Sequence, residues 1–287
     1  MQEILHIKKQ NNSCWYHDMG RKVIYMRTKI ASIQLWLSEG DNKSKRIEYV
    51  EKLIEQNSDA DLILLPELWA IGWRSFNRYE LEAETLEGEI ISRIGEKAKK
   101  VNAYIHIGSM VEKKENGFYN TAVLLNPEGK IIAVYRKIHL VSEKGAEEVA
   151  YLTPGKKIVF VETELGKLGF SICYDIRFPE LYRKMAVNHG VEIFLHVAAW
   201  PVGRAETWIE LCHARATENL AYLISCNCAG VDRGGKYFGH SSIVDPYGIS
   251  IASAGLNEAV IKGEIDVKEL RELRKTIPHL QNRVLPV

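Results

Sequence analysis

The sequence predicts an α/β protein in which helices cover β-sheets on both sides. From Lys29 onward, short apolar segments with strand character alternate with longer amphipathic segments of helical periodicity. Two hairpin turns, Asn126-Pro-Glu-Gly129 and Asp245-Pro-Tyr-Gly248, join neighbouring strands directly. Alternation of this kind, mixed with hairpins, is typical of sheets that lie between layers of helices.

The first half of the chain supplies two helices among short strands. Ile47, Val50, Leu53 and Ile54 recur on one face of the first predicted helix, whereas residues 62–65 are apolar throughout and predict a buried strand. The predicted elements, in order, are strand Ile30–Trp36, helix Lys43–Gln56, strand Leu62–Leu65, helix Glu89–Val101 and strands Tyr104–Val111, Thr121–Leu125 and Ile131–Tyr135.

The second half repeats the alternation. Its predicted elements are strand Gly169–Cys173, helix Pro179–Asn188, strand Ile193–Val197, helix Ala205–Glu218, strand Tyr222–Cys228 and strand Val260–Ile265. No linker rich in Pro, Gly or Ser and no short repeat interrupts the pattern. We therefore expect a single domain over residues 26–287.

Residues 1–25 do not fit this pattern. They show neither helical nor strand periodicity, and they lack the apolar core of a signal peptide. We interpret them as an N-terminal extension outside the core fold, which an upstream start codon would produce. A targeting role is the less favoured interpretation.

Composition and charge restrict the class of protein and of partner. Hydrophobic residues make up 46% and charged residues 26%, which is ordinary for a globular protein. The formal charge of +1 gives no reason to expect binding to nucleic acid or to an anionic membrane surface. No apolar run reaches the roughly 18 residues that a membrane span needs. Five cysteines at irregular spacing form no disulfide framework, so we expect a cytoplasmic protein.

Three strand ends carry an acid, a base and a thiol. One predicted strand leads into Pro66-Glu67, another into Arg136-Lys137, and a third into Ile172-Cys173. A lone cysteine on a strand is most often a buried core residue. However, the carboxyl ends of strands in open α/β folds are where ligands bind, so the three side chains together predict one reactive site. A thiol at the mouth of a strand-to-helix turn can act there as a nucleophile.

These three motifs, in this order, resemble those of the nitrilase, or carbon–nitrogen hydrolase, superfamily. The resemblance extends from about Lys29 to the last residues. It implies a four-layer α-β-β-α sandwich in which two sheets face each other. It also implies a catalytic triad of Glu67, Lys137 and Cys173 that hydrolyses amides without a cofactor or a metal ion. Cys226 and Cys228 are a weak metal signal, and we expect them to pack in the core or near the site.

The implied chemistry assigns a role to each triad residue. An amide needs a strong nucleophile, donors for the oxyanion and a proton for its nitrogen. Cys173 would attack the carbonyl carbon with Glu67 as base, Lys137 and the Tyr174 backbone N–H would hold the oxyanion, and water would hydrolyse the thioester. We expect Lys137 to lower the pKa of the thiol while partial burial raises that of Glu67. A purely structural Glu67–Lys137 ion pair is the alternative.

A second glutamate of the superfamily pattern falls on Glu148, shortly before the Pro-Gly turn at residues 154–155. Glu143 and Glu147 are its competitors. The chosen glutamate would orient Lys137, whereas a solvated loop carboxylate is the alternative interpretation.

Polar residues around the other two motifs have structural interpretations. We expect His139 to be a hydrogen-bonded structural histidine on the strand face of Lys137. Asp175 and Arg177 follow the thiol closely, and we expect a salt bridge between them that braces the turn.

Among the branches of the superfamily, the sequence resembles the omega-amidases most, chiefly through His196-Val-Ala-Ala-Trp200-Pro-Val-Gly-Arg204-Ala-Glu-Thr-Trp208. Omega-amidases hydrolyse the side-chain amide of 2-oxo acids derived from glutamine or asparagine. A guanidinium can bind a carboxylate bidentately, so Arg204 and the neighbouring Trp200 are the candidate contacts for a dicarboxylate monoamide such as 2-oxoglutaramate. A surface arginine at a helix N-terminus is the alternative for Arg204.

Other functions stay open at this point. Another amidase of the superfamily would act on deaminated glutathione or an N-carbamoyl compound, and nitrile hydrolysis is a less favoured variant. From different classes, the chain could be a non-catalytic binding protein or use Cys173 as a redox sensor. The superfamily commonly forms dimers, and the apolar segment 277–287 needs cover, so we expect a homodimer.

Overall fold

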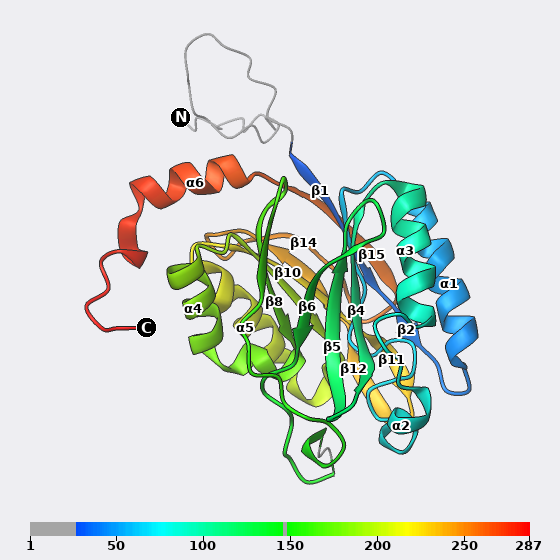
Figure 1. Ribbon diagram of the computed structural model, residues 1–287. Helices are drawn as coiled ribbons and strands as arrows, with labels where there is room; N and C mark the ends of the chain where they lie inside the picture. Colours follow the sequence, from blue (N-terminus) through cyan, green and yellow to red (C-terminus); the bar gives the residue numbers. More distant parts are fainter. Residues whose placement is uncertain (1–26, 146–147) are drawn as a thin grey trace, which may run out of the picture.

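The computed structural model describes residues 27–145 and 148–287 of the chain. The predicted extension at residues 1–25, and Glu147, therefore lie outside the described residues. Two six-stranded sheets face each other, with helices on both outer faces (Figure 1). The predicted α-β-β-α layering is confirmed.

The first sheet has the strand order β15-β1-β3-β4-β5-β6. Its core strands β1, β3 and β4 are parallel, while β15, β5 and β6 are added antiparallel. The strands are β1 (Thr28–Gln34), β3 (Leu62–Leu64), β4 (Tyr104–Lys114), β5 (Gly117–Leu125), β6 (Ile131–Arg136) and β15 (Ala259–Ile265). Helices α1 (Lys43–Gln56) and α3 (Glu89–Val101) pack on its outer face through side chains such as Ile47 and Ile94.

The second sheet has the strand order β14-β13-β10-β9-β8-β7, and β8, β9 and β10 are parallel. The strands are β7 (Phe160–Thr163), β8 (Gly166–Ile172), β9 (Ile193–Ala198), β10 (Tyr222–Asn227), β13 (Ser242–Val244) and β14 (Ser250–Ser253). Helices α4 (Pro179–His189) and α5 (Ala205–Thr217) cover its outer face, where Met185 and Trp208 are fully buried.

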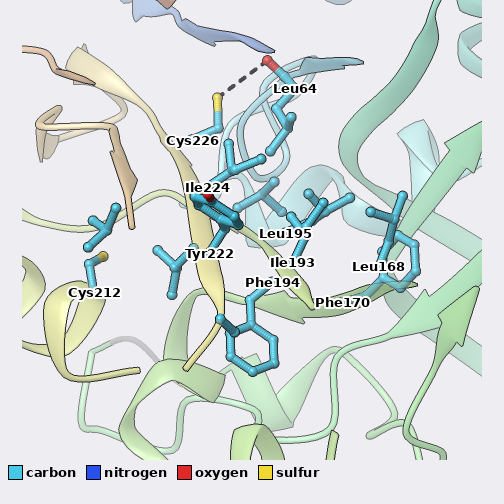
Figure 2. Packing of buried hydrophobic residues seen from close by; sticks show 14 of the residues in the cluster. Leu64, Leu168, Phe170, Ile193, Phe194, Leu195, Cys212, Tyr222, Ile224 and Cys226 are labelled. Carbon is cyan, nitrogen blue, oxygen red and sulfur yellow. Dashed lines mark hydrogen bonds between the residues drawn. The ribbon is translucent and has the colours of Figure 1, made fainter. Parts of the chain in front are cut away.

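The space between the sheets is filled by apolar side chains from both. Figure 2 shows Leu64 of the first sheet in the same apolar cluster as Phe170, Leu195 and Ile224 of the second. The Cys226 thiol donates across this interface to the Leu64 carbonyl oxygen at 3.5 Å. Cys226 and Cys228 are fully buried, which confirms that they are packing residues. Within the described residues, no group of three or more His, Cys, Asp or Glu side chains could hold a metal ion.

The remaining elements lie at the edges of the sandwich. A small sheet consists of β2 (Trp36–Leu37), β11 (Ala229–Asp232) and β12 (Gly235–Phe238). Short helical segments are α2 (Tyr79–Glu82) and five 3-10 turns at Phe76–Arg78, Glu148–Ala150, Cys173–Arg177, Val202–Arg204 and Pro278–Leu280. Helix α6 (Val267–Thr276) leaves the sandwich at one end, and residues 277–287 follow it (Figure 1). No helix in the described ranges has the length and apolar character that crossing a membrane requires.

Several predicted strands differ in extent from the observed ones. The strand expected over residues 30–36 is divided, because β1 ends at Gln34 and β2 pairs with β11 in another sheet. Strands β4 and β5 were predicted from their apolar residues, but their backbone pairing extends further, up to the Lys114–Gly117 pair next to the turn. Backbone pairing can continue into solvent, where side chains carry no apolar signal.

Candidate active site

Three buried charged side chains, two of which directly follow strands of the first sheet, lie in contact with one another. Glu67 follows β3, Lys137 follows β6, and Glu148 begins a 3-10 turn. The Lys137 Nζ lies 3.0 Å from Glu67 Oε1 and 2.8 Å from Glu148 Oε2, and all three side chains are fully buried. The structure thus brings together the predicted acid and base, and it places Glu148 beside them.

Two polar groups that the sequence did not single out complete the cluster. Asn120 Nδ2, on β5, donates to Glu67 Oε1 at 2.8 Å and to Glu148 Oε1 at 3.1 Å. The backbone N–H of Ala199 donates to Glu67 Oε2 at 2.8 Å. Asn120 could have been recognised in the sequence, because a polar asparagine in a mostly apolar strand indicates a buried hydrogen-bonding role. The Ala199 contact could not, because it uses a backbone N–H group, which every residue except proline has.

Cys173 occupies a strained elbow between β8 and its 3-10 turn. Its φ angle is +49°, a left-handed conformation that residues other than glycine rarely adopt. Its side chain is 6% exposed, so the thiol is covered by protein on most sides. Strain of this kind in a buried elbow is typical of residues that the surrounding structure holds for a function.

Asp175 holds this elbow in place. Its carboxylate accepts hydrogen bonds from the Ile172 N–H at 2.9 Å, from the His139 N–H at 3.0 Å and from the Tyr135 hydroxyl at 2.6 Å. It also pairs with His139 Nδ1 at 2.7 Å, so the prediction of a hydrogen-bonded structural histidine is confirmed. His139 does not lie on the strand, because β6 ends at Arg136.

The predicted Asp175–Arg177 salt bridge is wrong. The Asp175 carboxylate is already surrounded by the donors named above. The Arg177 guanidinium lies instead over the rings of Tyr174 and Trp200, with its central carbon 5.8 and 4.9 Å from their centroids. Cation–π contacts of this type are worth about 0.5–2 kcal/mol, and they place this charge beside the site.

The predicted direction of the pKa shift is correct for Glu67 but not for Cys173. Burial raises the pKa of Glu67, and the charge of Lys137 offsets only part of that effect. Burial and the charge of Glu67 also raise the pKa of the Cys173 thiol well above its usual value, although Lys137 acts in the opposite direction. Burial alone would lower the pKa of Lys137, but Glu148 and Glu67 more than offset it and raise that pKa well above its ordinary value. These shifts favour a protonated thiol and a charged Lys137.

A cleft of about 250 Å³ opens onto the thiol. Cys173 and Tyr174 form part of its wall, as do the predicted substrate contacts Trp200 and Arg204. The Glu67–Lys137–Glu148 cluster is not part of that wall. A ligand in the cleft would therefore meet the sulfur atom first.

Arg204 is already bound to a carboxylate of the chain itself. Its Nη1 donates to Glu143 Oε1 at 2.7 Å, and Nη2 donates to Glu143 Oε2. The bidentate geometry predicted for a substrate carboxylate is thus taken by Glu143. This pairing also removes Glu143 as a candidate for the second glutamate.

Comparison with known proteins extends over nearly the whole described chain. The family model for carbon–nitrogen hydrolases matches residues 29–275. A 2-oxoglutaramate amidase of Bacillus subtilis (strain 168) is 37% identical over 255 residues, which cover 88% of this chain and 96% of that protein. An omega-amidase of Homo sapiens is 31% identical over 261 residues, covering 87% and 92% respectively.

A similar solved structure is that of a CN-hydrolase superfamily protein of Xanthomonas campestris with an arsenic adduct in its active site. It has a TM-score of 0.84 and 28% identity, and the match covers 91% of this chain and 99% of that one. The segment matched by the family model includes every residue of the charged cluster and of the cleft wall.

Proposed function

The chain belongs to the carbon–nitrogen hydrolase family and hydrolyses amides, and from that premise we propose that it is an omega-amidase releasing ammonia from a short dicarboxylate monoamide such as 2-oxoglutaramate. Two observations support this substrate class. Relatives at 31–37% identity are named 2-oxoglutaramate amidase and omega-amidase. The cleft wall also contains Arg74, Arg204 and Lys236, and a cationic wall suits a substrate with a carboxylate at its far end.

The proposed reaction begins at the protonated thiol. Glu67 takes the Cys173 proton while the sulfur bonds to the amide carbon, and Lys137 with the Tyr174 N–H stabilises the oxyanion that forms. The carbon–nitrogen bond then breaks, and Glu67 gives its proton to the departing ammonia. Water next attacks the thioester with Glu67 again as base, which releases the carboxylate product and restores the thiol.

The observation that carries this proposal is the buried Glu67–Lys137–Glu148 cluster behind a strained cysteine at the wall of a cleft. A raised thiol pKa requires a base that receives the proton during attack, and Glu67 lies close enough for its charge to raise the pKa of Cys173. Glu148 keeps Lys137 charged and in position, so it serves as a positioning residue.

A substrate panel tests this function. Ammonia release from 2-oxoglutaramate, succinamate, deaminated glutathione, an N-carbamoyl amino acid and a nitrile would be compared at equal concentrations. We expect the two monoamides to give the highest kcat/KM. A preference for any other compound would replace the omega-amidase assignment. Absence of all turnover, together with rapid peroxide oxidation of Cys173, would favour a redox sensor instead.

Arg204 and Trp200 remain proposed substrate contacts because both line the cleft. A substrate carboxylate can reach the Arg204 fork only by displacing Glu143. Replacing Arg204 alone would leave Glu143 unpaired beside the substrate, so the informative variant is the double replacement Glu143→Gln with Arg204→Ala. Comparison of its KM for succinamate with that of the wild type measures the contribution of Arg204 without an exposed opposite charge.

The assembly and extent of the enzyme are proposals as well. We propose a single catalytic domain over residues 26–287 and a homodimer in which the C-terminal segment reaches the partner. Val284 is 95% exposed and Leu285 is 80% exposed, which supports a covering partner for that segment. Within the described chain Cys173, Cys212, Cys226 and Cys228 are free thiols, consistent with a proposed reducing compartment.

A further inference from the structure

Two of the three cations in the cleft wall lack an anionic partner. Arg204 is bound to Glu143, whereas neither Arg74 nor Lys236 forms an ion pair with any residue in the described ranges. Arg74 packs its guanidinium 5.9 Å from the centroid of the Trp73 ring, and Lys236 is exposed on β12. An anion entering the cleft would therefore find these two charges available without breaking an existing pair.

The same part of the wall contains two buried donors that have no hydrogen-bond partner among residues 27–145 and 148–287. They are Trp73 Nε1 and the Tyr237 hydroxyl, and both residues line the cleft. The two residues are 8% and 4% exposed, respectively. A buried donor left unpaired is unfavourable, so these two groups favour a ligand that accepts hydrogen bonds from them.

The fold holds these groups together rigidly. A Cβ at Gly72 would lie 1.9 Å from Asp232 Oδ2, so the loop that carries Trp73 and Arg74 is docked tightly on β11. A Cβ at Gly235 would lie 3.1 Å from Arg74 Cδ and 3.0 Å from the Tyr237 hydroxyl oxygen. The Arg74 side chain and the Tyr237 hydroxyl therefore both pack close to the backbone at Gly235.

This group is also tied directly to the reactive end of the cleft. Tyr237 forms an isolated β-bridge with Pro201, and the Phe238 N–H donates to the Trp200 carbonyl oxygen at 2.9 Å. Ala199, which precedes Trp200, donates its N–H to Glu67. The cations and the base are therefore positioned by one continuous stretch of backbone contacts.

We propose that Arg74, Lys236, Trp73 and Tyr237 form the subsite that binds the far carboxylate of the substrate while its amide lies against Cys173. This inference rests on the proposed function. A carboxylate is an acceptor with about four lone-pair sites, which matches two cations and two neutral donors. In this arrangement Arg204 stays paired with Glu143, and binding of the far carboxylate by Arg204 is the competing arrangement.

Steady-state kinetics of single variants test the subsite. Arg74→Ala, Lys236→Ala and Tyr237→Phe would be compared on succinamate and on its uncharged isostere 4-methylpentanamide. We expect Arg74→Ala to raise the KM for succinamate about tenfold. Lys236→Ala should raise it about threefold, because the exposed Lys236 charge is partly screened, and Tyr237→Phe should raise it about threefold, because that change removes one neutral hydrogen-bond donor. In all three variants, the KM for the isostere and the kcat values for both substrates should stay within about twofold of the wild-type values.

Arg233→Ala provides the matched control. Arg233 lies in the turn of the same β11–β12 hairpin but does not line the cleft, so the variant removes the same charge without touching the subsite. Its KM for succinamate should match the wild type. The proposed subsite would be overturned if Arg74→Ala raised the KM for succinamate and for the uncharged isostere by the same factor. It would also be overturned if the Glu143→Gln/Arg204→Ala variant raised the KM for succinamate more than Arg74→Ala does.

Direct binding separates failure of the subsite from failure of the proposed function. Succinate, the dicarboxylate product, would be titrated calorimetrically into wild type and Arg74→Ala enzyme. If no amide is hydrolysed but succinate binds about tenfold more weakly to Arg74→Ala, the anion subsite stands and the omega-amidase proposal falls. If amides are hydrolysed and succinate binds both proteins equally, the subsite proposal is wrong.

Discussion

Lys137 is a single ammonium shared by two buried carboxylates, Glu67 and Glu148. Burying an unequal number of charges is costly, and the excess negative charge is one reason why the pKa of Glu67 is raised. Proton transfer from Cys173 would neutralise Glu67 and move that negative charge to the oxyanion, which Lys137 also faces in the proposed mechanism. The cluster is therefore more stable when the substrate carries the charge, which is what transition-state stabilisation requires.

The pH profile tests this coupling at the residue scale. Glu67 must be ionised to accept a proton, so kcat/KM should fall as pH decreases through its pKa, which burial raises above the ordinary value of about 4.3. The negative charge of Glu148 raises this pKa further, so Glu148→Gln should move the acid limb to lower pH while decreasing kcat about a hundredfold.

Glu143→Gln is the control for that profile. It removes a carboxylate from the cleft wall without changing the Glu67–Lys137–Glu148 cluster. Its acid limb should coincide with that of the wild type. An acid limb that stays in place in Glu148→Gln would show that the two glutamates are not coupled as described.

At the scale of elements, a bulge in β4 fixes the loop that carries Glu67. The pairing of β4 with β5 shifts register between His106 and Ser109, and Gly108 there has a φ angle of +74°. A Cβ at Gly108 would lie 1.9 Å from the Pro66 carbonyl oxygen, directly before Glu67. The base is therefore positioned by close backbone approach, which only glycine allows.

Gly108→Ala should consequently affect both stability and activity. We expect a loss of more than about 2 kcal/mol in the free energy of unfolding, measured by urea denaturation, and at least a tenfold loss of kcat. Gly190→Ala is the matched control, since Gly190 also has a positive φ angle but a Cβ there would meet no atom within 4 Å. That variant should lose only about 1 kcal/mol and keep full activity. If Gly108→Ala and Gly190→Ala lost the same stability and the same activity, the strain of a positive φ angle alone would explain the effect.

The same elements show what the sequence could and could not predict. Helices α1 and α3 were predicted to the residue, because the apolar periodicity that indicates a helix is a local property of the sequence. Glu67, Lys137 and Cys173 were found from the sequence because each lies at the end of an apolar strand segment. The Ala199 N–H, the Glu143–Arg204 pair and the Arg74–Lys236 group were not, because each depends on contacts between residues distant in the sequence.

For the whole molecule, the arrangement of the C-terminal segment predicts a dimer. Helix α6 leaves the sandwich, and the apolar side chains of Val284 and Leu285 beyond it are exposed. Light scattering at micromolar concentration should therefore give twice the 32.7 kDa mass of the chain. Deletion of residues 278–287 should shift the equilibrium toward monomer. A monomeric mass for the intact protein would contradict this prediction.

The central claim is that Cys173 becomes covalently acylated during turnover. Mass spectrometry of enzyme quenched during the reaction with a slowly hydrolysed monoamide tests it most directly. We expect the peptide that contains Cys173 to gain the mass of the acyl group, and Cys173→Ala to show neither the adduct nor turnover while keeping the unfolding midpoint close to that of the wild type. Turnover by Cys173→Ala, or an adduct on another residue, would contradict the account.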